Sequence, residues 1–347
     1  AMLPPVDFDV LEYHLQVPKE WYQQGSIRFL PHNIYGNMPL GAETLSIPAM
    51  ALLPGEDSWW WGALVGKLLI AGFAPLTALG VFAAGQRFAN TTAGVIAALA
   101  FISTPWMAVV SMNGLIDGVL GCYLFLSLYG FAIWYSEGRT SAGMVLLSGL
   151  LAGSALACKY PAMLFVVLPL CVAFAWPYEK MRWRPVVLFV LAVAMSGGLW
   201  LGKNAISAGN PTYPLLYSVF GGESRTEAKD EQWNKAHQVP PDAKGRRFSL
   251  PQAWNSLVNV FGKSRWQSPL LLPLMLLVLI NPTTRRQARP WLLYAGCFLL
   301  CWWLFTHRIE RFWVPLLPVL AMLAGIGACW SAHRLWRQVL WGVIGVL

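Results

Sequence analysis

Residues 141–177 read SAGMVLLSGLLAGSALACKYPAMLFVVLPLCVAFAWP, and Lys159 is the only charged residue among them. A bilayer core is about 30 Å thick and requires roughly 20 apolar residues per helix. Because lipid cannot satisfy backbone polar groups, apolar runs of this length must form helices, here at 141–158 and 161–177. The stretch therefore indicates an all-α, polytopic transmembrane helical bundle.

The rest of the chain has the same character. Of its 347 residues, 56% are hydrophobic and 12% are charged, whereas a soluble domain has roughly 25% charged residues. The apolar runs predict further helices at 59–84, 94–112, 115–135, 185–203, 268–281, 291–306 and 313–331, with another beginning near 338, which gives about ten crossings. The run at 268–281 contains Pro269 and Pro273, so we expect it to start earlier, tilt, or thin the bilayer.

The basic residues set the orientation. The net charge is +9, but the charges lie in short clusters between apolar runs, without the continuous patch typical of nucleic-acid binding. Counting crossings places the following residues on one side: Arg87, Arg139, Lys180, Arg182, Arg184, Arg285, Arg286, Arg289, Arg334 and Arg337. The positive-inside rule makes that side cytoplasmic. The opposite side receives residues 1–58, 113–117, 159, 204–267 and 307–311.

These assignments divide the chain into four segments. Residues 1–58 form a first extracytoplasmic loop, 59–203 form membrane helices, 204–267 form an extracytoplasmic cap of short helices, and 268–347 form C-terminal membrane helices. The chain starts without a targeting segment and ends inside an apolar run, so we expect a preceding membrane helix and a C-terminal continuation.

The first loop contains the motif VLEYHLQVPKEWYQQG at residues 10–25. It predicts an interfacial amphipathic helix that Pro18 kinks or splits and Gly25 ends. Trp21 and Tyr22 are expected at the level of the lipid headgroups.

The cysteines lie in apolar runs without metal-ligand spacing or paired loop positions. We predict that they are buried packing residues. They are Cys122, Cys158, Cys171, Cys297, Cys301 and Cys329.

Acidic residues crowd the start of the first loop. Asp7, Asp9, Glu12 and His14 lie just outside the membrane, where a carboxylate can act as a general base or two can hold a divalent cation. Asp7 or Asp9 can equally cap the helix. Asp117 lies near the outer end of an apolar run, and it either faces an aqueous cavity or caps its helix.

Cationic residues lie at the outer helix ends. These residues can bind a lipid-linked phosphate through charge-assisted hydrogen bonds. They are Lys159, Lys203 with Asn204, His307, Arg308 and Arg311. Long basic side chains at helix ends also snorkel to the interface without any function. Lys67, below the tryptophans at 59–61, allows the same two interpretations.

Several segments together resemble the GT-C membrane glycosyltransferases that use lipid carriers, such as aminoarabinose transferases and protein O-mannosyltransferases. DFDVLEYHLQVPKEWYQQG followed by NMPLGAETL resembles the acidic first loop of that family, and NGLIDGVLGCYLF resembles its second acidic site. GLLAGSALACKYPAMLFVVLP, KNAISAGNPTYPLLY and RIERFWVPLLPVLAMLAG are similar to later stretches. The likeness covers most of the chain, and the order of the motifs makes it specific.

The resemblance implies transfer of a sugar from a polyprenyl-phosphate donor to an acceptor, with inversion, at the outer face of a bacterial inner membrane. It implies Asp9 as the general base, with Glu12 and Asp117 at the acceptor site. Lys159, Lys203, Arg308 and Arg311 would hold the donor phosphate. A metal, if one is used, would be a divalent cation on Asp7 and Asp9, although a two-residue Asp spacing is too common to identify such a site.

Two other functions compete with this hypothesis. A non-catalytic subunit or scaffold could keep the fold while packing against a partner in a membrane complex. A lipid or sugar transporter would show polar residues at mid-membrane depth and interrupted helices in matching halves. The ionisable residues instead lie mainly at one face and no repeat is evident, which disfavours transport.

Overall fold

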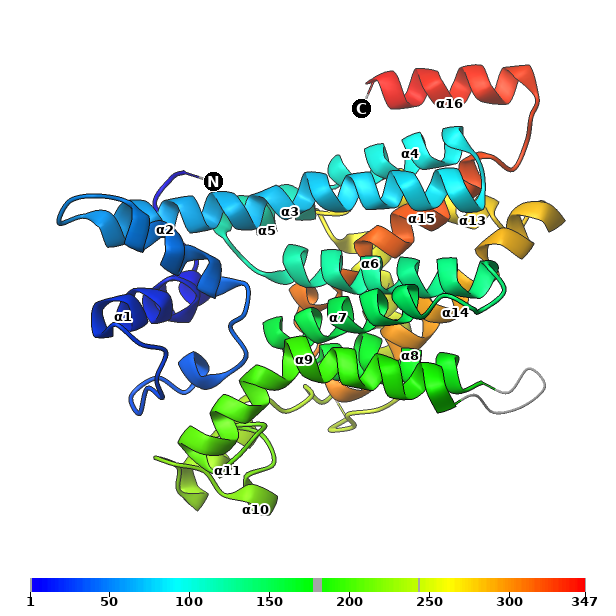
Figure 1. Cartoon of the computed structure of the whole chain (residues 1–347). Helices are drawn as coiled ribbons and strands as arrows, with labels where there is room; N and C mark the ends of the chain where they lie inside the picture. Colours follow the sequence, from blue (N-terminus) through cyan, green and yellow to red (C-terminus); the bar gives the residue numbers. More distant parts are fainter. Residues whose placement is uncertain (1, 177–182, 243, 347) are drawn as a thin grey trace.

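The computed structural model describes residues 2–176, 183–242 and 244–346, and the regular elements in these ranges are helices. Figure 1 shows the long helices running side by side, with short helices gathered at one end. The first loop contains η1 (Val10–His14), α1 (Gln16–Gln24), η2 (Tyr35–Asn37), η3 (Glu43–Leu45) and α2 (Ser46–Leu52). The bundle then contains α3 (Ser58–Phe88), α4 (Thr91–Ile102), α5 (Pro105–Asn113), α6 (Asp117–Ser136), α7 (Ala142–Cys158), η4 (Met163–Val167), α8 (Leu168–Ala175) and α9 (Trp183–Ala208).

Short helices follow α9 before the chain returns to the bundle. They are α10 (Tyr217–Phe220), α11 (Glu227–Ala236), α12 (Leu250–Val258) and η5 (Asn259–Lys263). The remaining helices are α13 (Leu271–Leu277), α14 (Pro282–Phe305), η6 (Glu310–Leu316), α15 (Leu317–Ala328) and α16 (Arg334–Val346).

The described residues contain five helices that are long and apolar enough to cross a membrane, or six if the bent pair α4–α5 forms one span. The five are α3, α6, α9, α14 and the continuous segment Glu310–Ala328. Residues Ala142–Cys158 and Met163–Ala175 form shorter apolar helices. The chain is therefore an integral membrane protein with a helical bundle, as the sequence predicts, although these spans do not add up to the expected number of crossings.

Two predicted helices differ from the observed ones because of proline. The run at 94–112 is broken into α4 and α5, which are bent by 54°. Thr104 adopts an extended ψ of 120° before Pro105, since the proline ring excludes the helical conformation of the preceding residue. The run at 268–281 yields only the seven-residue α13, which begins after Pro269 and contains Pro273.

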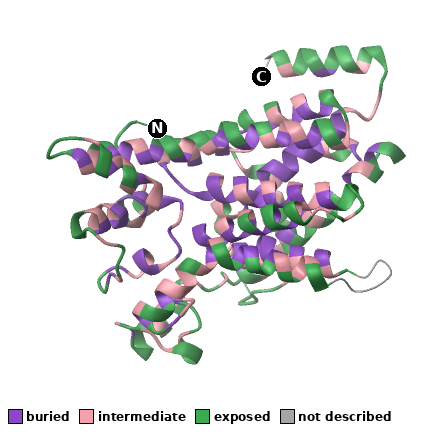
Figure 2. Ribbon diagram, viewed as in Figure 1, coloured by how far each residue is buried: buried purple, intermediate pink, exposed green. Residues whose placement is uncertain are grey.

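Helix α15 is the centre of the bundle. Every residue from Leu317 to Ala328 is buried, and Figure 2 shows this buried core among the surrounding helices. A helix that is apolar on all sides is expected in such a position. Gly327 allows α13 to approach closely, because a Cβ there would lie 1.9 Å from the carbonyl oxygen of Leu274.

Small residues bring α7 and α9 into backbone contact. Gly149 and Gly153 of α7 face α9, where a Cβ on Gly153 would lie 2.5 Å from the Val193 carbonyl oxygen. Gly197 of α9 faces Gly153 in return. Small residues spaced by four allow such packing where no hydrophobic force drives helices together in lipid. The contact fixes α7, the helix that ends at Lys159.

We predict that Gly197→Ala lowers the stability of the bundle. The new Cβ would lie 2.7 Å from the Gly153 carbonyl oxygen, and overpacking of this kind costs about 1–3 kcal/mol. Gly202→Ala on the same helix is the matched control, because its Cβ meets nothing within 4 Å. Thermal unfolding of both variants in detergent tests the prediction, and an equal effect of the two substitutions would contradict it.

The bundle has two chemically different ends. The cap end lies at the left of Figure 1 and contains α1, α2, α10 and α11. The arginine end contains the turns between α3 and α4 and between α6 and α7, where Arg87 pairs with Glu137 at 2.5 Å. Lys180 and Arg182 fall outside the described residues.

The predicted interfacial helix is split, as the proline suggests. Helix η1 is separated from α1 by Leu15, and α1 ends at Gly25 in the left-handed region with φ of 67°. Trp21, which the sequence predicts at the headgroup level, packs inside the first loop with Val17, Leu30 and Leu40. Its side chain is buried, and its indole Nε1 donates to the carbonyl of Arg28 at 2.9 Å.

The structure also settles the positions of the cysteines and of Lys67. Cys122 and Cys158 are buried as predicted, but Cys297 is exposed on the bundle surface and Cys171, Cys301 and Cys329 are half-buried. The ammonium of Lys67 donates to the Leu3 carbonyl at 2.8 Å, and the residue is buried. Lys67 therefore fastens the start of the chain to α3 and does not snorkel.

Candidate active site

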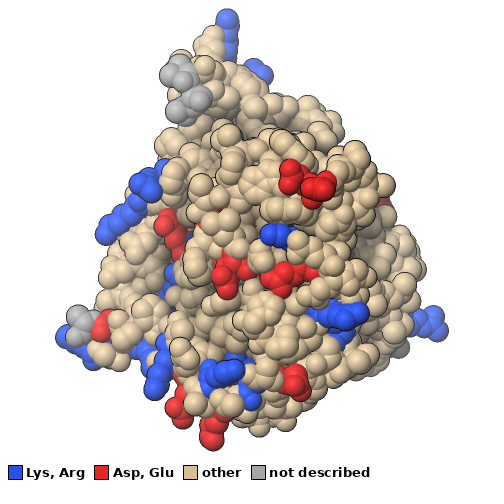
Figure 3. All heavy atoms as spheres, turned by 90° about the vertical axis from the view of Figure 1, so that its left-hand side faces the viewer, with Lys and Arg blue, Asp and Glu red and all other residues tan. Residues whose placement is uncertain are grey.

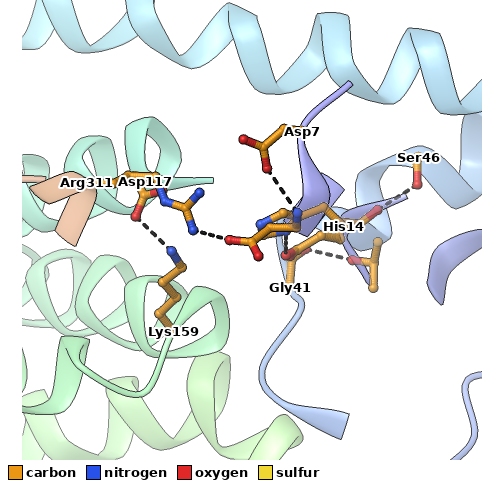
Figure 4. A network of polar contacts seen from close by, with 10 residues as sticks. Asp7, His14, Gly41, Ser46, Asp117, Lys159 and Arg311 are labelled. Carbon is orange, nitrogen blue, oxygen red and sulfur yellow. Dashed lines mark hydrogen bonds and ion pairs between the residues drawn. The ribbon is translucent and has the colours of Figure 1, made fainter. Parts of the chain in front are cut away.

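Four charged side chains from distant parts of the sequence form one alternating charge network at the cap end: Asp9, Arg311, Asp117 and Lys159. Arg311 contacts the Asp9 carboxylate through Nη2 and lies 3.2 Å from Asp117 Oδ2 through Nε. Lys159 Nζ donates to Asp117 Oδ1 at 2.8 Å. Figure 4 shows Arg311 and Lys159 converging on Asp117.

Each member of the charge network stands at the end of an element. Asp9 precedes η1, and Asp117 is the first residue of α6. Lys159 follows the last residue of α7 in an extended conformation, while Arg311 lies in η6. The charge network therefore forms where helix ends and turns from four parts of the chain meet at one end of the bundle.

Burial makes the pairing obligatory for Asp117. Its side chain is fully buried, whereas those of Lys159 and Arg311 are 16% and 15% exposed. A buried carboxylate without partners is strongly unfavourable. Asp9 is the most open member at 28% exposure, so it is the carboxylate of the network that a ligand can reach most easily. Figure 3 shows acidic and basic side chains together across this face.

A second pair lies beside the charge network. His14 Nδ1 and Glu43 Oε1 are 2.6 Å apart, and both side chains are fully buried. Burial raises the pKa of Glu43 to about 8 and lowers the pKa of His14 well below its usual value. At neutral pH the Glu43 carboxyl is therefore protonated, and its O–H donates a hydrogen bond to the neutral imidazole of His14. His14 was among the residues that the sequence singled out, but Glu43 was missed.

We predict that stability falls between pH 6.5 and 8 because of Glu43. Its pKa rises from 4.5 in the unfolded chain to about 8 in the fold, so the folded state binds more protons in that interval and rising pH favours unfolding. His14 has a lowered pKa, and its opposite contribution is only half titrated at its ordinary value of 6.5, so it offsets about 0.4 kcal/mol of the Glu43 effect. The expected loss from Glu43 itself is about 2 kcal/mol.

Thermal unfolding at pH 6.5 and 8 measures this loss, and Glu43→Gln should abolish most of it. Lys159 and Asp117 also act on the pKa of Glu43, Lys159 lowering it and Asp117 raising it. An equal decline with pH in the wild type and in Glu43→Gln would assign the effect to another group.

The first loop is fastened to α7 next to the charge network. The backbone N–H of Gly41 donates to the carbonyl of Ala157 at 2.8 Å. A Cβ on residue 41 would lie 2.9 Å from that same oxygen, so a larger residue would separate the two segments. The contact lies two residues before Lys159 in the sequence.

Some predicted site residues lie elsewhere. Asp7 accepts a hydrogen bond from the backbone N–H of Asp9 at 3.0 Å, which matches the capping interpretation. Glu12 is exposed and pairs with no member of the charge network. Lys203 has its Nζ 5.3 Å and 5.2 Å from the Trp21 and Trp200 ring centroids, and it too lies outside the network.

No group of three or more potential metal ligands occurs among the described residues. Asp7 and Asp9 are engaged with a backbone N–H and with Arg311, respectively.

A basic pocket of about 450 Å³ adjoins the charge network through η6. Its lining includes Lys263, Arg265, Arg308, Glu310 and Trp302. Arg308 has a left-handed backbone with φ of 58°, and its Nε donates to the Trp303 carbonyl at 2.9 Å. Non-glycine residues in that region are strained and often functional. Sequence reasoning found Arg308 but missed Lys263 and Arg265.

Comparisons with known proteins agree with this architecture. Residues 51–200 match the family model described as dolichyl-phosphate-mannose-protein mannosyltransferase. A search of curated protein sequences finds no significant match.

Two solved structures share the fold at low identity. ArnT from Cupriavidus metallidurans bound to undecaprenyl phosphate is 15% identical with a TM-score of 0.66, and the match covers 99% of this chain and 59% of that one. The Archaeoglobus fulgidus oligosaccharyltransferase in complex with Zn and sulfate is 14% identical with a TM-score of 0.61, over 98% and 47% of the two chains. The chain thus spans about half the length of these two solved structures. The GT-C fold predicted from the sequence is confirmed.

Proposed function

We propose that this chain transfers a sugar from a polyprenyl-phosphate-linked donor to an acceptor at the extracytoplasmic face, with inversion and with Asp9 as the general base. The observation that carries the proposal is that η6 connects the charge network to a pocket rich in cations. Arg311 of η6 pairs with Asp9 in the charge network, and its neighbour Glu310 lines the basic pocket.

The basic pocket suits the donor phosphate. The charge network is balanced, since Asp9 and Asp117 offset Lys159 and Arg311, so an added phosphate needs further cations. Lys263, Arg265 and Arg308 outnumber Glu310 in the pocket lining, and Trp266 and Trp302 add apolar surface. Charge-assisted hydrogen bonds to phosphate are stronger than neutral ones. The ArnT relative holds undecaprenyl phosphate, which supports the same class of donor here.

The reaction is a single displacement at the anomeric carbon. Asp9 accepts the proton of the acceptor hydroxyl as its oxygen forms the new bond to that carbon. The bond from the anomeric carbon to the phosphate oxygen breaks, and the polyprenyl phosphate leaves with the electron pair. Arg311, Lys159 and the pocket cations stabilise the negative charge that develops on the phosphate.

The cap end is the extracytoplasmic side in this proposal. The clustered arginines at 285, 286 and 289 lie in the first turns of α14, and Arg87 lies in the last turn of α3. Both belong to the end opposite the cap, which the positive-inside rule assigns to the cytoplasm.

A transfer assay tests the proposal. The complete protein in proteoliposomes is offered a panel of polyprenyl-phosphate sugars, and the anomeric configuration of the product is determined by NMR. Transfer with inversion supports the proposal. Retention of configuration contradicts the single displacement, and no turnover by folded protein across the panel favours the scaffold hypothesis.

A further inference from the structure

A second cavity lies at the cap end, outside the charge network. It is an aromatic cleft of about 360 Å³ between the first loop and α11. Its lining includes His32 and Tyr35 from the first loop and Arg225, Lys229, Trp233 and His237 from the cap, and no carboxylate is among its lining residues. The cleft therefore combines positive charge with aromatic rings.

Arg225 is the unusual member of this lining. Its side chain is only 1% exposed, and one nitrogen pairs with Asp230 at 2.6 Å. Its Nε and Nη1 are buried without a hydrogen-bond partner among the described residues. Buried charged donors without hydrogen-bond partners are costly in free energy. A hydrogen-bond acceptor supplied by a ligand would therefore stabilise Arg225. Side-chain adjustments on binding are common and would bring the guanidinium onto that ligand.

A row of rings joins the aromatic cleft to the charge network. Trp233 lies 5.5 Å from Tyr35, and Tyr35 stacks on Tyr13 at 5.3 Å. Tyr13 lies near Asp9. Burial and the negative charge of Asp9 together raise the pKa of the Tyr13 phenol. On the other side, His237 lies 5.3 Å from His307.

On the side of His237 and His307, the row of rings also ends at the charge network. His307 lies 5.0 Å from Phe312, and Lys159 Nζ lies 5.0 Å from the Phe312 centroid. Burial lowers the pKa of His307 to about 4, with the charges of Lys159 and Arg311 adding to the effect. His307 is therefore neutral at pH 7, and the positive charge at the cleft comes from Arg225 and Lys229. Packed rings therefore connect the walls of the cleft to the charge network on both sides.

We infer that the aromatic cleft is an acceptor subsite that binds an anionic group, phosphate or carboxylate, carried on a saccharide ring. The assignment of this subsite to the acceptor rests on the proposed function, but the binding of an anionic saccharide does not. Arg225 and Lys229 hold the anion, and the faces of Tyr35 and Trp233 line the space beside it. The part of the acceptor beyond this group then lies on the Tyr35 side of the cleft, where Tyr35 stacks on Tyr13 near Asp9.

Equilibrium binding to the complete protein in nanodiscs tests this subsite without donor or turnover. The probes are a hexose phosphate, a hexuronic acid and neutral glucose. At least one anionic probe should bind about tenfold more tightly than glucose, and the one that does so identifies phosphate or carboxylate as the preferred group. Because Arg225→Gln can disturb the cap, Lys229→Gln is the second variant, and both should reduce the preference severalfold.

Lys235→Gln is the matched control, since it removes one positive charge from α11 without touching the cleft lining. Equal binding of all three probes, binding of none, or an equal loss in Lys235→Gln and Lys229→Gln would overturn the inference. A failure of sugar transfer alone would leave the binding result unchanged, so the two proposals are separable.

Discussion

Asp9→Asn is expected to lower kcat for sugar transfer by about 10²–10⁴-fold, the range that general base catalysis contributes. An amide has nearly the shape of the carboxylate but cannot accept the proton of the acceptor hydroxyl. Its oxygen can still accept a hydrogen bond from Arg311, so thermal unfolding and the KM for the donor should change little. Steady-state kinetics in proteoliposomes measure the loss.

Asp7→Asn is the matched control for this substitution. Asp7 lies two residues away and holds the backbone N–H of Asp9, so its amide should keep most of the activity. Full activity in Asp9→Asn would remove Asp9 from the reaction. An equal loss in both variants would indicate that only the local backbone matters.

Arg311→Met is expected to destabilise the protein by about 3–5 kcal/mol, the typical result of removing one partner from a buried ion pair. Asp117 is fully buried and would retain Lys159 alone, while Asp9 would lose the contact that ties the first loop to η6. Thermal unfolding in detergent measures the change, and transfer activity should fall with it.

Two further variants separate charge from packing in this prediction. Arg311→Lys keeps the charge but loses the planar fork that reaches both carboxylates, so it should recover only part of the stability. Adding Asp117→Asn to Arg311→Met should also recover stability, because it removes the buried charge left behind. If the double variant is no more stable than Arg311→Met, the loss comes from packing and not from electrostatics.

The bundle was largely predictable because its signals are local. Apolar runs gave helices such as 141–158, which the structure places at Ala142–Cys158. The break between α4 and α5 was not predicted, since the apolar run continues across Pro105 and hydropathy alone does not register the lost hydrogen bond. In the run 268–281 the two prolines had indicated an irregular span, and the structure keeps only α13 at Leu271–Leu277.

The candidate site was only partly predictable. Composition and position singled out Asp9, Asp117, Lys159 and Arg311, but not that they pair, because Asp9 and Arg311 lie 302 residues apart. Lys263 and Arg265 looked like ordinary members of a polar cap. Glu43 had a usable signal, as it is the only charged residue in the apolar stretch 38–53, and a lone acid in such a stretch is usually buried with a partner.

The bond between Gly41 and Ala157 has a mechanical consequence. It joins the loop that carries Asp9 and Glu43 to the last turn of α7, and α7 is itself locked to α9 through Gly153 and Gly197. The base and the Lys159 ammonium should then fluctuate as parts of one rigid body, with their separation preserved.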